Sequence, residues 1–106
     1  FEKAYSGTGN LTASKGTTAF KANIDLSDTN FIHSNGKVLI NPTGASSTVT
    51  GPANFHDFEL KKSAAINGNN SYNDFTASGL SDQTITFEAG KKQTINGILT
   101  SCYSTD

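Results

Sequence analysis

The amino-acid sequence predicts an all-β protein, and within that class a short parallel β-solenoid of about four to five coils. Ser, Thr, Asn and Gly together make up 47 of the 106 residues, a composition that favours short strands and turns over helices. Seven Phe and three Tyr accompany a net charge of -1, which is typical of an ordered protein with a thin core. About ten short apolar segments alternate with turn signals, and such strands are short for a sandwich. An antiparallel β-sandwich is the alternative.

The expected strands follow one another along the chain and end at glycine, proline or asparagine turns. Residues 19–26 alternate in their second half, so that Ile24 and Leu26 share one face. Asn35-Gly36 predicts a sharp reversal after the next strand, and in a sandwich this turn would make a hairpin. The remaining expected strands are residues 30–33, 37–40, 48–50, 55–60, 64–66, 72–77, 84–87, 93–96 and 98–100.

The apolar positions of these strands predict a narrow core. Inward-facing Val, Ile, Leu and Phe side chains would fill it, and outward Thr, Ser and Asn would meet water. The residues expected to be buried are Val38, Ile40, Val49, Phe58, Leu60, Ile66, Phe75, Ile85, Phe87, Ile95 and Leu99.

A weak internal sequence repeat, called the echo below, supports a fold built of successive coils. Residues 54–58 and residues 71–75 both read polar, aromatic, polar, Asp, Phe, so that Tyr72 repeats the position of Phe55. A looser match relates Phe31 to Phe55 in the same way. Offsets of about 17–24 residues suit one turn of a solenoid, so parallel neighbours are expected at these separations.

Several segments resemble the repeats of bacterial adhesin-like surface proteins with right-handed parallel β-helix folds. In that family many coils read as strand, Gly turn, strand, Asn-Gly, and residues 84–97 are similar to this pattern. Residues 37–44, 48–51 and 55–60 resemble the same repeat in the same order. The resemblance covers about residues 37–100. It implies a scaffold without catalytic positions, so no functional residue is carried over from the family.

The length suits a single domain, with residues 11–106 as one β domain. Residues 1–10 are Gly-rich and polar, and we expect a flexible or subunit-contacting lead-in there, with Phe1 and Tyr5 as apolar contacts. No signal peptide is visible and the chain opens without Met, which is compatible with a secreted mature fragment. Cys102 cannot form an intrachain disulfide, and an apolar position near the end of the chain is its expected role.

Charge and motif content exclude several function classes. Eight Lys and Arg stand against nine Asp and Glu, which is too weak a positive surface for a nucleic-acid partner. No stretch is long enough for a transmembrane helix. Asp57, Glu59 and Asp74 are carboxylates of the kind used in polysaccharide cleavage, but the echo of Asp57 and Asp74 favours a repeated turn role. We therefore expect no enzyme and no cofactor.

Three further patterns carry weaker expectations. His33 and His56 lie about one coil apart, but they fall short of the four ligands that zinc prefers, so no metal site is expected. Asn10 and Asn69 each begin a sequence that matches the glycosylation sequon. The two Thr-x-Thr strands at residues 48–50 and 84–86 place hydroxyls on one face, where they could order water. The favoured interpretation is that these threonines are ordinary β-branched strand residues without a binding role.

Together these observations predict a non-catalytic extracellular structural or adhesive module, secreted or at the cell surface. Self-assembly into a surface filament is expected, because short solenoids leave sheet edges open at both ends. The expected partners are copies of the chain or flanking solenoid coils. The alternative function is a carbohydrate-binding β-sandwich module, with carbohydrate as its partner.

Overall fold

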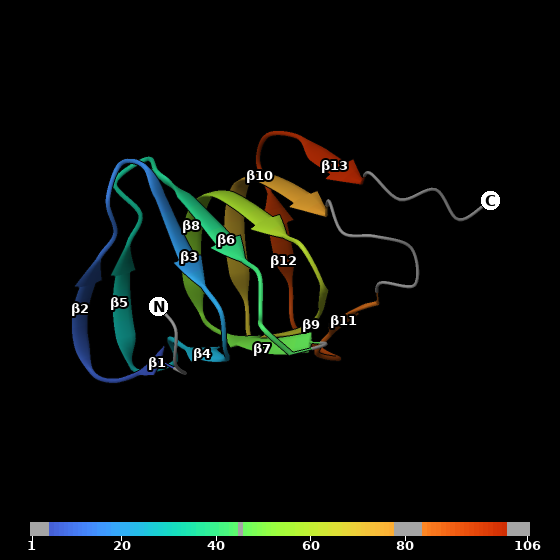
Figure 1. Cartoon of the computed structure of the whole chain (residues 1–106), viewed down its shortest axis with the longest axis horizontal. Coiled ribbons are helices and arrows are strands. Elements are labelled where there is room, and N and C mark those ends of the chain that lie inside the picture. Colours follow the sequence, from blue (N-terminus) through green and yellow to red (C-terminus); the bar gives the residue numbers. More distant parts are fainter. Residues whose placement is uncertain (1–4, 45, 78–83, 102–106) are drawn as a thin grey trace.

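A computed structural model describes residues 5–44, 46–77 and 84–101 of the chain. The described residues form strands and turns without a helix, and the chain winds as a parallel solenoid (Figure 1). The strands are β1 (Tyr5–Ser6), β2 (Gly9–Thr12), β3 (Thr17–Phe20), β4 (Ile24–Asp25), β5 (Thr29–Ile32), β6 (Lys37–Ile40), β7 (Ser46–Thr50), β8 (Ala53–Leu60), β9 (Ser63–Asn67), β10 (Asn70–Ala77), β11 (Ile85–Phe87), β12 (Gln93–Ile95) and β13 (Leu99–Ser101).

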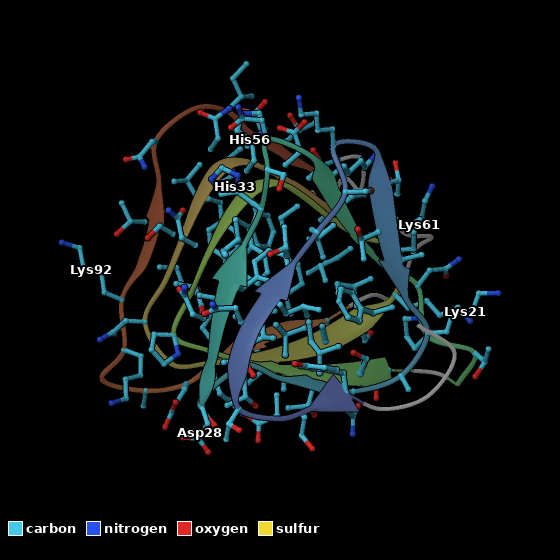
Figure 2. The ribbon with its side chains drawn as sticks, turned by 90° about the vertical axis from the view of Figure 1, so that its left-hand side faces the viewer. Lys21, Asp28, His33, His56, Lys61 and Lys92 are labelled. Carbon is cyan, nitrogen blue, oxygen red and sulfur yellow. The ribbon has the colours of Figure 1, made fainter. Side chains whose placement is uncertain are left out.

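The solenoid has three faces, which Figure 2 shows end-on as a triangle. Face A is the five-stranded sheet β1-β4-β7-β9-β11, which runs along the bottom of Figure 1. Face B holds the two-stranded sheet β2-β5, followed by the first halves of β8 and β10 and then β12. Face C holds β3, β6, the second halves of β8 and β10, and β13. Each face therefore has five levels, and the segments that share a level form one coil.

Strand pairing is parallel throughout the described residues, so the solenoid prediction is confirmed and the antiparallel sandwich is wrong. The echo between residues 54–58 and 71–75 is a real coil repeat, because Phe55 pairs in register with Tyr72 and Phe58 with Phe75. The coils differ in length. Hydrogen bonds between neighbouring coils join Ala53 to Asn70 across 17 positions and Asn23 to Thr48 across 25. This range agrees closely with the expected separation.

The core prediction is correct in the middle of the solenoid and wrong at its end. Seven of the eleven expected residues are buried, and Ile85 and Ile95 are partly buried. Phe87 and Leu99 are 46% and 64% exposed, because they lie on the last coil, where no described residue stacks on them. The hydrophobic core also contains residues outside the prediction, namely Phe20, Ile24, Leu26, Phe31, Phe55, Ala64 and Tyr72.

The Asn35-Gly36 turn does not form a hairpin. It is the corner at which β5 on face B leads into β6 on face C. The left-handed backbone conformation falls on Ser34 and Asn35, with φ of 54° and 59°. Gly36 is required for a different reason, since a Cβ there would collide with the backbone carbonyl oxygens of Ser14 and Gly16 in the first coil.

The expected lead-in is part of the solenoid from Tyr5 onward. Tyr5 and Ser6 form β1 against β4, and residues 9–12 form β2 against β5. The first coil therefore covers the N-terminal end of the core. The expected subunit contact of this segment stays a prediction, and Phe1 lies outside the described residues.

A buried polar network stabilises the corner between faces A and B. Asn70 is 3% exposed, and its Oδ1 accepts a hydrogen bond from the backbone N–H of Ala53 at 3.0 Å. Its Nδ2 donates to the backbone oxygen of Asn67 and to Gln93 Oε1, each at 3.2 Å. The Tyr72 hydroxyl also donates to Gln93 Oε1, at 2.6 Å. These bonds join the third, fourth and fifth coils through groups that would be costly to bury unpaired.

Candidate binding surfaces

A crevice opens on face B because two successive coils differ in length there. Asp25 pairs with Thr50 on face A, and Lys37 pairs with Asp57 on face C. Twelve positions separate Asp25 from Lys37, whereas seven separate Thr50 from Asp57. The five extra residues of the second coil cannot stay in register with the third, so β5 and the first half of β8 are not paired.

Backbone hydrogen bonds mark the two ends of this crevice. Leu26 N–H donates to Thr50 O at 2.7 Å at one end, and Asp57 N–H donates to Gly36 O at 3.2 Å at the other. Between these bonds, no backbone hydrogen bond joins residues 27–35 to residues 51–56, all of which lie in the described part of the chain. Thr29 N–H donates to Leu26 O and Ala53 N–H donates to Asn70 Oδ1, and the other backbone groups that face the crevice from β5 and β8 are available for another partner.

Side chains bridge the crevice from beneath. The rings of Phe31 and Phe55 have centroids 5.3 Å apart, and both residues are buried. The rings of His33 and His56 lie 5.5 Å apart at the corner between faces B and C, where Figure 2 labels them. These two ring pairs hold the coils together where backbone bonds are lacking.

The crevice has a volume of about 290 Å³ and an uncharged lining. Its apolar part comes from Phe31, Pro52 and Ala53. Its polar part combines three amides with two hydroxyls, those of Asn30, Asn54, Asn69, Thr29 and Ser71. Such a mixture suits a neutral polar ligand better than an ion.

The histidine pair does not have the geometry of a metal centre. Asn35 N–H donates to His33 Nδ1 at 2.8 Å, so in the neutral ring the proton lies on Nε2. Neither nitrogen of His33 then offers a free lone pair to a cation. The described residues contain no cluster of three or more His, Cys, Asp or Glu suited to a metal ion.

The candidate carboxylates form structural contacts. Asp57 and Asp74 are register partners on neighbouring coils, and Asp74 Oδ1 accepts a hydrogen bond from Ile98 N–H at 2.9 Å. Glu59 pairs with Lys37 and, at 3.3 Å, with Lys61. The contact given for Asp57 is a different one, with His56 Nδ1 at 3.5 Å, so the repeated turn role of Asp57 and Asp74 stays a prediction. The expectation that the protein is not an enzyme stays a prediction.

The C-terminal end of the solenoid carries a second, apolar surface. A pocket of about 330 Å³ lies there, and its lining is almost wholly apolar. Ile98, Leu99 and Phe87 are exposed beside or within it. Strands β11, β12 and β13 have no neighbour on their outer side among the described residues. Three open strand edges therefore surround an uncovered core.

The other expected site residues are dispersed. Tyr5 is partly buried against the core, and Asn10 and Asn69 are exposed. Asn10 Oδ1 accepts a hydrogen bond from Asn30 Nδ2 at 3.2 Å, and Asn69 Oδ1 accepts one from Lys92 N–H at 2.7 Å. Cys102 lies outside the described residues.

The two Thr-x-Thr strands belong to face A but are not adjacent. Strand β9 separates them, so that Ala65 lies between Thr48 and Thr86 in register. The row of hydroxyls is therefore interrupted, which weakens the case for an ordered array of water.

The crevice was not foreseen from the sequence, although its cause is visible there. Phe55 lies further along the chain from Phe31 than Tyr72 lies from Phe55, although the three rings occupy successive coils. This difference signals a coil with an insertion. It does not show on which face the extra residues lie.

Comparison of the chain with family profiles, with curated proteins and with solved structures finds no match. No described segment is a helix with the length and apolar character needed to cross a membrane.

Proposed function

We propose that this protein is a non-catalytic structural and adhesive module of an extracellular or cell-surface assembly, and that copies of the chain stack head to tail. The observation that carries this proposal is the apolar pocket lined by Phe87 and Leu99 on the last coil, which no residue of the described part of the chain covers. Apolar area in such a surface favours burial by about 25 cal/mol per Å².

The first coil has the features that would allow it to cover that end. Strands β1, β2 and β3 have no neighbour on their outer side among the described residues, so they can accept a parallel partner. Tyr5, Leu11 and Ala13 are partly buried there and present apolar surface. Because the two ends differ, their contact is heterologous, and repetition of such a contact generates an open filament.

The small net charge of the chain also favours association between copies. A net charge of -1 gives little repulsion between copies. Exposed strand edges without charged side chains are prone to pair with other edges. The resemblance to adhesin-like surface repeats supports an extracellular setting.

Sedimentation velocity over a range of chain concentrations tests the proposal. The parent chain should form concentration-dependent oligomers, and Leu99→Lys should shift it towards monomer, because a buried lysine at the contact would lack a partner. Ser46→Lys is the matched control, since it adds the same charge on the exposed surface of face A, away from both ends. A parent chain that stays monomeric at every concentration would refute the proposal, as would equal assembly of the parent and Leu99→Lys.

A further inference from the structure

We propose that the crevice between β5 and β8 on face B is a binding site for a neutral carbohydrate. The site is separate from the ends of the solenoid, so this inference does not depend on head-to-tail stacking. Its volume of about 290 Å³ suits one sugar ring rather than a large ligand. The absence of charged side chains among its lining residues argues against phosphate, acidic sugars and cations as ligands.

The crevice offers hydrogen-bonding groups that the fold leaves unused. The side chains of Asn54 and Ser71 make no hydrogen bond within the described part of the chain. Asn69 Oδ1 accepts a hydrogen bond from Lys92 N–H, which leaves Asn69 Nδ2 available to a ligand. Asn30 Nδ2 donates a hydrogen bond to Asn10 Oδ1, which leaves Asn30 Oδ1 available. Each amide combines a donor with an acceptor, which matches the paired donor and acceptor character of sugar hydroxyls.

The unpaired strand edges add backbone donors and acceptors to this set. No backbone hydrogen bond crosses the crevice between residues 27–35 and residues 51–56 in the described chain. A ligand rich in hydroxyls can form hydrogen bonds with these backbone groups. The apolar floor formed by Phe31, Pro52 and Ala53 can pack against the C–H face of a sugar ring.

The contact between the Phe31 and Phe55 rings argues against a peptide strand as the ligand. Inserting a strand requires about 9.6 Å between its neighbours, which is twice the usual spacing of about 4.8 Å. The Phe31 and Phe55 rings, with centroids 5.3 Å apart, connect the two coils beneath the opening. This contact would have to break before a strand could enter, whereas a sugar ring can lie above it.

Titration of the isotope-labelled chain, followed by its amide resonances in NMR, tests the proposal. The probes are the methyl glycosides of glucose, galactose, mannose and N-acetylglucosamine, with glycerol as a small polyol control. At least one glycoside should cause saturable shifts confined to residues 29–33, 52–56 and 69–71. Asn54→Ala should weaken this binding at least tenfold. Asn96→Ala, which removes an exposed amide at another corner, should bind like the parent.

Two results would overturn the proposal. One is that none of the four glycosides causes saturable shifts in the crevice, or that glycerol causes the same shifts at the same concentration. The other is that Asn54→Ala and the parent bind equally. The unperturbed spectrum of each variant shows that it is folded, so loss of binding cannot be confused with loss of structure.

Discussion

The ring of Tyr72 stacks on that of Phe55, one coil earlier, with centroids 5.5 Å and planes 16° apart. The two residues are register partners in β10 and β8. Phe58 and Phe75 extend the same cluster, with ring centroids 5.1 Å and 4.9 Å from that of Tyr72. Aromatic stacking along the axis thus links the third and fourth coils, and the hydroxyl of Tyr72 extends the link to Gln93 in the fifth.

Burial of Tyr72 predicts a loss of stability at alkaline pH. Burial raises the pKa of the Tyr72 hydroxyl above its ordinary value, and a side-chain hydrogen bond from Asn70 offsets only part of that rise. The folded state therefore keeps a proton that the unfolded state releases above about pH 10, so the free energy of unfolding falls as pH rises further. The contribution of the Tyr72 hydroxyl to the free energy of unfolding is fully present below about pH 10. Above that pH it falls by at most about 1.4 kcal/mol per pH unit.

Urea unfolding between pH 8 and pH 11.5 measures this effect. Tyr72→Phe removes the titrating group, so the slope above pH 10 should be smaller than in the parent. Tyr5→Phe keeps the Tyr72 hydroxyl and serves as the control. Identical slopes for the parent and Tyr72→Phe would show that this hydroxyl ionises as readily in the folded state as in the unfolded state.

Two phenylalanines of similar sequence context should differ sharply in their contribution to stability. Phe58 is 1% exposed and its ring lies 4.7 Å from that of Phe55, so Phe58→Ala should cost about 3–5 kcal/mol. Phe87 is 46% exposed at the open end, and Phe87→Ala should cost about 1 kcal/mol or less in the monomer. Chemical denaturation at low protein concentration gives both values. Equal costs would mean that the last coil is covered in solution.

The fold class could be predicted from the sequence because residues that pair in register on neighbouring coils are similar in sequence. Residues 54–58 and 71–75 match position by position, and the structure pairs them accordingly. Phe87 and Leu99 follow the same pattern of alternation as buried strands, so their exposure depends on what stacks on the last coil and not on local pattern. The crevice depends on where the extra residues of a longer coil are accommodated, which local propensity does not encode.

Gly36 should be much less tolerant of substitution than Gly44. A Cβ at Gly36 would collide with backbone oxygens of the first coil, which cannot move without disrupting β3 and its pairing. Gly36→Ala should therefore cost about 1–3 kcal/mol. Gly44→Ala meets nothing within 4 Å, so it should be neutral or slightly stabilising. Thermal unfolding of both variants checks this prediction, and a neutral Gly36→Ala would contradict the close packing of the first two coils.

Electron microscopy of the concentrated parent chain tests the central claim most directly. If copies stack head to tail, five coils at about 4.8 Å each give filaments with an axial repeat of about 24 Å per copy, with strands perpendicular to the filament axis. Leu99→Lys should abolish these filaments, whereas Ser46→Lys should retain them. Dispersed single particles at every concentration, or filaments that persist in Leu99→Lys, would contradict the account.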